Sequence, residues 1–180
     1  AYEILRCLVG SEMCIRDSGI SVFGLAERMN VERKEAKELI DGYFETYPGV
    51  KAYMDQSIRV AQEKGYVETI FHRKRFLPDI NSRNAVVRGY AERNAINAPI
   101  QGSAADIIKV AMARIYQRFR AEGIKAKMIL QVHDELNFSV PIDEKERVEE
   151  IVIEEMEKAY RMHVPLKADC GWGKNWLEAH

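Results

Sequence analysis

The stretch MILQVHDELNFSV, residues 128–140, constrains the fold more than any other part of the chain. Apolar and polar residues alternate over Leu136–Val140, which is the period of a half-buried β-strand. The apolar run at Met128–Leu130 is continuous and therefore predicts a more buried strand. Since few residues separate the two runs, the simplest structure is a β-hairpin with His133 and Asp134 at its tip.

The turn of this hairpin has an unusual composition. It lacks the Asn-Gly or Gly-X pairs that two-residue hairpins favour, so contacts outside the turn are expected to hold its backbone. A carboxylate at the rim of a sheet, such as that of Asp134 with Glu135 beside it, is well placed to bind a hard cation such as Mg²⁺ near a phosphate. Taken by itself, the stretch fits a solvated polar turn somewhat better than a metal site.

Composition bounds the size and the charge of the molecule. The 180 residues, 47% hydrophobic and 31% charged, suit one globular unit or two small subdomains that share a core. A formal net charge of -1 argues against uniform coating by nucleic acid, but the charge is uneven. Residues 58–93 carry eight bases against four acids, and residues 142–158 carry three bases against eight acids. One face could therefore meet a polyanion while another repels it.

Cysteine usage and hydropathy indicate the compartment. Cys7, Cys14 and Cys170 form no C-x-x-C pair and are odd in number, which favours a reducing interior. No run approaches the roughly 20 apolar residues of a membrane helix, and no cleavable leader is recognisable. We therefore expect a soluble, cytoplasmic protein with no membrane partner. The chain begins with Ala1 rather than Met, which indicates a fragment.

A basic turn lies between two short predicted strands. Residues 66–70 and 75–77 have strand-like composition, and the turn between them contains Arg73, Lys74 and Arg75. A β-ribbon with a cationic tip fits a phosphate contact and a solvated hairpin end about equally well.

A polar stripe follows within a long helical pattern. Arg93, Asn97 and Gln101 recur every four residues, which places them on one face of a helix. Three long hydrogen-bond donors in a row suit the acceptors that every base pair presents in the minor groove, although an ordinary solvated stripe explains them as well. Pro99 interrupts this pattern, so Ala98 is expected at a kink or at the junction of two helices.

The predicted order of elements indicates an α+β fold, with a helical portion followed by an antiparallel sheet. From Gln101 onward the order is helix, strand, strand, helix, strand. This is an incomplete split β-α-β layout that lacks its first strand. A two-metal site for phosphoryl transfer needs acids from at least two places, so the metal-binding partner of Asp134 is expected outside this chain.

Four motifs resemble the C-terminal region of bacterial DNA polymerases of family A, the DNA polymerase I type. They are RNAINAPIQGSAADIIKVAM, QVHDEL, RFLPDINSRN and GWGKNW, and the resemblance runs from Gly19 to about His180 with matching order and spacing. In that family the acid of QVHDEL binds catalytic metal. The resemblance therefore assigns that role to Asp134, places His133 near the primer 3' terminus and makes Glu135 an accessory acid.

The resemblance also implies partners and a reaction. It assigns Arg93, Asn97 and Gln101 to the minor groove of primer-template DNA, and it places Ser21 and Phe23 near the template. It implies Mg²⁺-dependent attack of a primer 3'-hydroxyl on the α-phosphate of a dNTP, with release of pyrophosphate.

The family pattern divides the chain into three segments. Residues 19–100 resemble the later part of the fingers and residues 101–180 the later part of the palm. Residues 1–18 match nothing in the family, and we hypothesise that they are translated adaptor or read-through sequence. The upstream palm, thumb and fingers segments are missing, so the isolated chain is expected to be inactive.

Two other functions compete with this one. A non-catalytic DNA-binding module could use the same basic turn and polar stripe. A metal phosphohydrolase with an adjacent His-Asp pair is disfavoured, because such pairs lie on helices and recruit further ligands, whereas His72, His163 and His180 are scattered.

Overall fold

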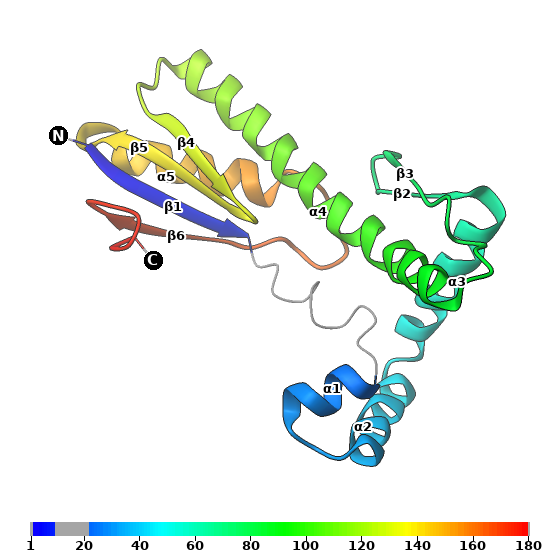
Figure 1. Ribbon diagram of the computed structural model, residues 1–180. Helices are drawn as coiled ribbons and strands as arrows, with labels where there is room; N and C mark the ends of the chain where they lie inside the picture. Colours follow the sequence, from blue (N-terminus) through cyan, green and yellow to red (C-terminus); the bar gives the residue numbers. More distant parts are fainter. Residues whose placement is uncertain (1, 10–21, 180) are drawn as a thin grey trace. The chain divides into compact units, whose positions relative to one another are not determined.

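The chain divides into two compact units in a computed structural model that describes residues 2–9 and 22–179 (Figure 1). The helical unit comprises residues 12–103, and the sheet unit comprises residues 1–11 and 104–180. Helix α4 (Ala85–Glu122) begins in the first unit and ends in the second. In the described residues, no helix is both long and apolar enough to cross a bilayer.

In its described residues, the helical unit contains three helices, a small β-hairpin and the first part of α4. Its core gathers small and aliphatic side chains, including Ala61 of α3, Val67 of the hairpin and Ala95 of α4. Helix α3 starts with a proline at its first turn and ends at Gly65, whose positive φ suits a helix C-terminus. The elements are α1 (Val22–Met29), α2 (Arg33–Thr46), α3 (Pro48–Lys64), β2 (Tyr66–Glu68) and β3 (Lys74–Phe76).

The sheet unit contains a four-stranded antiparallel sheet in the order β4-β5-β1-β6. Its strands are β1 (Tyr2–Val9), β4 (Lys127–Val132), β5 (Glu135–Pro141) and β6 (Ala168–Gly173), and the short helix η1 (Ile142–Glu144) leads into α5 (Lys145–Glu157). Alternate residues of the central strands, such as Leu5 and Phe138, are fully buried against Ile115 of α4 and Val152 of α5. The two helices therefore cover one face of the sheet.

The α+β class and the antiparallel sheet are confirmed, but the missing first strand is a wrong prediction. Strand β1 lies in the centre of the sheet, where Leu5 pairs with Phe138 on one side and with Trp172 on the other. The strands thus follow the complete split β-α-β order. Leu5 and Cys7 are buried and Arg6 lies on the opposite face, so β1 has the period of a strand. Its partners are distant in the chain, and local patterning could not reveal them.

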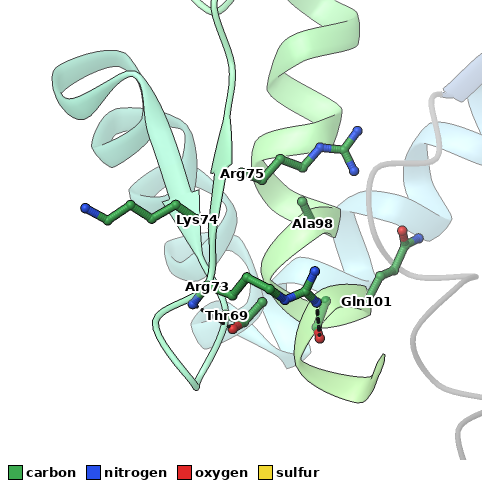
Figure 2. A pocket seen from close by; sticks show the side chains of 7 residues that line it. Thr69, Arg73, Lys74, Arg75, Ala98 and Gln101 are labelled. Carbon is green, nitrogen blue, oxygen red and sulfur yellow. Dashed lines mark hydrogen bonds between the residues drawn. The ribbon is translucent and has the colours of Figure 1, made fainter. Parts of the chain in front are cut away.

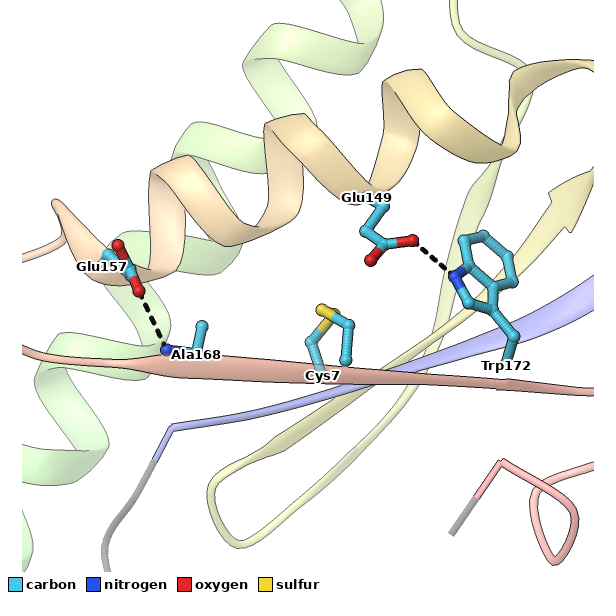
Figure 3. The surroundings of a disulfide bond; sticks show 6 residues. Cys7, Glu149, Glu157, Ala168 and Trp172 are labelled. Carbon is cyan, nitrogen blue, oxygen red and sulfur yellow. Dashed lines mark hydrogen bonds between the residues drawn. A yellow bond between two sulfur atoms is a disulfide. The ribbon is translucent and has the colours of Figure 1, made fainter.

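A disulfide joins β1 to the edge strand β6. Cys7 and Cys170 are direct cross-strand partners with an S–S distance of 2.07 Å, and the bond faces α5 (Figure 3). Close by, the Trp172 indole N–H donates to a Glu149 carboxylate oxygen of α5 at 2.6 Å. Cysteine usage, which favoured a reducing interior, did not predict this bond. The two residues are 163 positions apart, so no local spacing signals the pair.

Helix α4 is one continuous helix with Pro99 inside, so a junction of two helices at Ala98 is wrong, while the alternative of a kink there stays a prediction. Proline removes one backbone donor, but two carbonyl groups next to it accept hydrogen bonds from side chains. Tyr53 donates its hydroxyl to the carbonyl of Ile96 at 3.3 Å, and Ser103 donates to the carbonyl of Pro99 at 2.5 Å. One contact from α3 and one within α4 thus accompany the proline, and the helix continues despite its local cost.

The hairpin predicted at residues 128–140 is confirmed, but its pattern of burial is reversed. Strand β4 is an edge strand, and Ile129 and Leu130 are exposed next to an irregularity in its pairing with β5. Strand β5 lies inside the sheet, where even Asn137 is only 1% exposed. Position in the sheet, rather than the apolar run, thus decides which strand is buried.

Candidate active site

The turn between β4 and β5 consists of His133 and Asp134 alone. Val132 and Glu135 form the pair that closes the hairpin. His133 has a φ of 52°, in the left-handed region, where a side chain with a Cβ costs about 1–2 kcal/mol. The turn therefore projects Asp134 from the end of the sheet by means of a backbone conformation that its own residues disfavour.

The contacts that the sequence predicted around this turn are present. The side-chain amide of Gln131 donates to the carbonyl oxygen of His133 at 2.6 Å. On the next residue, Glu135 accepts a hydrogen bond from Arg6 at 2.8 Å and one from the Trp176 indole at 3.4 Å. The ion pair raises the pKa of Arg6 above its ordinary value, chiefly through the hydrogen bond to Glu135. The turn is thus held by side chains on both of its flanks.

These contacts engage Glu135, one of the two neighbouring acids at this end of the sheet. The Glu135 carboxylate is 12% exposed and both of its oxygens accept hydrogen bonds, so it is poorly placed as a ligand. Asp134 is half-buried and interacts electrostatically with Arg6, and its carboxylate oxygens are of the type that Mg²⁺ prefers. In the described parts of the chain, no three His, Cys, Asp or Glu side chains gather into a metal site. Among the residues of this turn, Asp134 is therefore the better candidate for a metal ligand.

A cationic pocket of about 90 Å³ lies in the helical unit, between the β2–β3 hairpin and α4 (Figure 2). Arg73 and Arg75 extend toward α4, whereas Lys74 extends to the other side of the hairpin. The lining residues are Thr69, Arg73, Lys74, Arg75, Ala98, Gln101 and Gly102. Two guanidinium groups beside an open cavity make a suitable anion site.

The hairpin is fixed on α4 by contacts to Gly102 and Ser103, two residues that the sequence did not single out. Arg73 donates to the carbonyl of Gly102 at 3.1 Å, and the backbone N–H of Ile70 donates to Ser103 Oγ at 2.9 Å. A Cβ at Gly102 would lie 2.6 Å from Thr69 Cγ2, so the close approach requires glycine. The small side chains at positions 102 and 103 were the available signal of a close contact. The hairpin that they contact lies some 30 positions earlier, so the local sequence does not identify it as the partner.

The predicted polar stripe lies on α4 in the helical unit. Arg93 and Gln101 are exposed and Asn97 is half-buried, and Gln101 also lines the cationic pocket. The buried end of the Asn97 amide is its oxygen Oδ1. Within the described residues that oxygen has no hydrogen-bond partner. The stripe therefore combines two exposed side chains with one half-buried amide.

The two residues predicted near the template have different outcomes. Phe23 lies in α1, is exposed, and has the Arg33 guanidinium over its ring at 5.1 Å from the centroid. Ser21 lies outside the described residues. Of this pair, Phe23 has a described position, which lies within the helical unit.

Comparison with known proteins decides the family. A sequence profile of DNA polymerase family A matches residues 18–178. The chain belongs to DNA polymerase family A. Its family-A relatives include the DNA polymerase I of Lactococcus lactis subsp. lactis (strain IL1403), 52% identical over 161 residues, that of Streptococcus pneumoniae (strain TIGR4), 54% identical, and that of Bacillus caldotenax, 53% identical. Each alignment covers 89% of this chain and 18% of the relative, so the chain spans less than a fifth of their length.

A solved family-A structure is also similar. The polymerase domain of Pol1 from M. smegmatis, in complex with a DNA primer-template and dNTP, has a TM-score of 0.92 and 31% sequence identity. The match covers 98% of this chain and 40% of that one. Since 98% exceeds the share that the family profile matches, at least part of β1 has a structural counterpart in that domain.

Proposed function

We propose that this chain is the C-terminal portion of a DNA-directed DNA polymerase, and that Asp134 is one of its metal-binding acids. The observation that carries the proposal is the position of Asp134 in a two-residue turn at the end of an antiparallel sheet, in a chain of DNA polymerase family A. Bound Mg²⁺ would neutralise phosphate charge and activate the primer hydroxyl. His133, which is exposed beside Asp134, would lie near the primer 3' terminus.

Glu135 would act through position rather than as a ligand. Its carboxylate is held by Arg6 and Trp176, so its effect on the site is to fix the start of β5 directly after Asp134. A two-metal site needs acids from at least two places, and the described residues do not gather such a group around Asp134. The isolated chain is therefore proposed to be inactive, with the second acid supplied by the missing upstream palm.

The helical unit would bind primer-template DNA. The arginines of the cationic pocket suit backbone phosphates, and Arg93, Asn97 and Gln101 suit the minor groove, with Phe23 near the template. The related Pol1 domain was solved with primer-template and dNTP, which supports the same partners for this chain. We assign residues 19–100 to the fingers and 101–180 to the palm, and the division of the units between Ser103 and Ala104 supports this assignment.

A gain of activity on restoration tests the proposal. The missing upstream palm, thumb and fingers segments of a family-A polymerase are joined to this chain, and primer extension is measured with dNTPs and Mg²⁺. We expect the isolated chain to bind primer-template weakly without extending it, and the joined polymerase to extend it. Robust extension by the isolated 180 residues would contradict the assignment of the active site.

A non-catalytic DNA-binding module remains the second candidate. The pocket and the polar stripe both lie within the helical unit and require nothing from the β4–β5 turn. Under this alternative, restoring the upstream segments leaves the protein without synthesis, while substitution of Asp134 changes nothing measurable. Under the polymerase proposal, both experiments change primer extension.

A further inference from the structure

The turn that carries Asp134 has a left-handed backbone conformation that its own residues do not favour. Two-residue hairpin turns usually place Gly, Asn or Asp where φ is positive, but here histidine occupies that position with a φ of 52°. His133 is also exposed, so core packing does not hold it in place. Some other contact must favour this conformation over the extended ones that histidine prefers.

Gln131 supplies that contact. Its side-chain amide donates to the carbonyl oxygen of His133 at 2.6 Å, which ties the turn back to the preceding strand. Gln131 pairs with Leu136 across the hairpin, whereas Val132 pairs with Glu135, so Gln131 and Glu135 lie on opposite faces of the sheet. The turn is therefore clamped from one face by Gln131 and from the other by the partners of Glu135.

We propose that Gln131 is a positioning residue that holds the turn in the left-handed conformation from which Asp134 reaches its metal. The part that concerns metal rests on the proposed function, and the part that concerns the turn stands without it. The role needs a neutral donor on a side chain of this length. Asparagine is one methylene shorter, glutamate lacks the N–H group, and methionine matches the length without any donor.

Amide hydrogen exchange in the 180-residue chain tests the turn directly. The measured groups are the backbone N–H groups of Val132 and Glu135, the pair that closes the hairpin. Loss of one hydrogen bond in Gln131→Met is expected to make their exchange about fivefold faster. Gln117→Met is the matched control, because Gln117 is an exposed glutamine of α4 in the same unit. Unchanged exchange in Gln131→Met, or the same increase in the control, would overturn the proposal.

A second substitution tests whether the hydrogen bond from Gln131 acts by stabilising the left-handed backbone of His133. Glycine adopts positive φ without the cost of a Cβ, so His133→Gly removes the need for the clamp. On that background, Gln131→Met is expected to accelerate exchange by less than about twofold. A fivefold faster exchange in both backgrounds would show that Gln131 stabilises the hairpin without acting on the turn, and would contradict the proposal.

The metal part has its own readout in a complete polymerase that contains this segment. Gln131→Met is expected to raise the Mg²⁺ concentration for half-maximal synthesis and to lower kcat about tenfold, with KM for DNA unchanged. A faster-exchanging turn with unchanged Mg²⁺ dependence would reject the positioning role and leave the proposed function intact. The proposed function would fail by a different result, which is continued synthesis by Asp134→Ala.

Discussion

Gly102 has no room for a side chain, because a Cβ there would lie 2.6 Å from Thr69 Cγ2. We expect Gly102→Ala to push the β2–β3 hairpin away from α4 and to break the bond from Arg73 to the carbonyl of residue 102. The affinity for primer-template should fall about tenfold, as measured by fluorescence anisotropy at low salt. Gly42→Ala in α2 is the control, since no described atom lies within 4 Å of a Cβ there. Equal affinities for both variants would contradict the close-approach argument.

The arginines of the pocket should matter more than the lysine between them. Arg73 and Arg75 extend toward α4, while Lys74 extends away and lies over the ring of Tyr66 at 4.4 Å. Substitution of a phosphate-binding arginine is expected to reduce the slope of log affinity against log salt by about one. We predict this change for Arg73→Ala and a smaller one for Lys74→Ala. A larger effect of Lys74→Ala would show that DNA approaches the opposite side of the hairpin.

At these residues the sequence predicted local position better than tertiary contact. The acid of the turn and the polar stripe were recognisable, because motif and spacing are local properties. Thr69, Gly102 and Ser103 were missed, since their role depends on two segments that fold against each other. Gln131 stood inside a recognised motif, yet its bond to His133 required knowledge of the left-handed turn.

Helix α4 continues through Pro99, and the proline should therefore cost stability. Proline lacks the N–H that would bond to the carbonyl of Ala95, and a proline inside a helix costs about 3 kcal/mol. We expect Pro99→Ala to raise the free energy of unfolding by about 1–3 kcal/mol in urea titrations followed by circular dichroism. A decrease would show that the surrounding contacts require the proline ring.

Helices α4 and α5 are joined by an ion network that should weaken in acid. Glu122 accepts hydrogen bonds from Arg147 and Arg118, and these lower its pKa below the ordinary 4.5, with Arg147 the larger cause. A carboxyl with a lowered folded pKa contributes stability above its unfolded pKa, and that contribution is lost as the pH falls through the folded value.

The network gives a pH-dependent prediction. Glu122→Gln should unfold at a lower urea concentration than the parent chain at about pH 6, and the difference should shrink toward about pH 3. Glu38→Gln in α2, an exposed acid for which no hydrogen bond is observed, is the control. A difference that is constant across this range would contradict an electrostatic origin.

Elements with a strong local period were predicted, whereas elements defined by distant partners were not. The β4–β5 hairpin, α3 and α5 follow from apolar spacing and from the residues at their ends. Strand β1 is recognisable only beside β5 and β6, which lie more than 120 residues further along the chain. The same reason explains why β4 was expected inside the sheet, although its edge position leaves Ile129 and Leu130 exposed.

The whole molecule is a family-A segment whose sheet unit carries Asp134 in its β4–β5 turn and whose helical unit carries the cationic pocket. The segment matches 18% of the length of its sequence relatives. The fold and the family were predictable from sequence because motifs of matching order span most of the chain. The assignment of catalysis to Asp134 is the central claim that experiment must decide.

The most direct test compares Asp134→Ala with Asp143→Ala in a complete polymerase that contains this segment. Asp143 is an exposed acid of η1 in the same unit and serves as the control. The measurement is the rate of single-nucleotide incorporation at saturating Mg²⁺, together with the Kd for primer-template. We predict that Asp134→Ala lowers the rate at least about a thousandfold with Kd within about threefold, and that Asp143→Ala changes neither. Synthesis at the parent rate by Asp134→Ala would contradict the account.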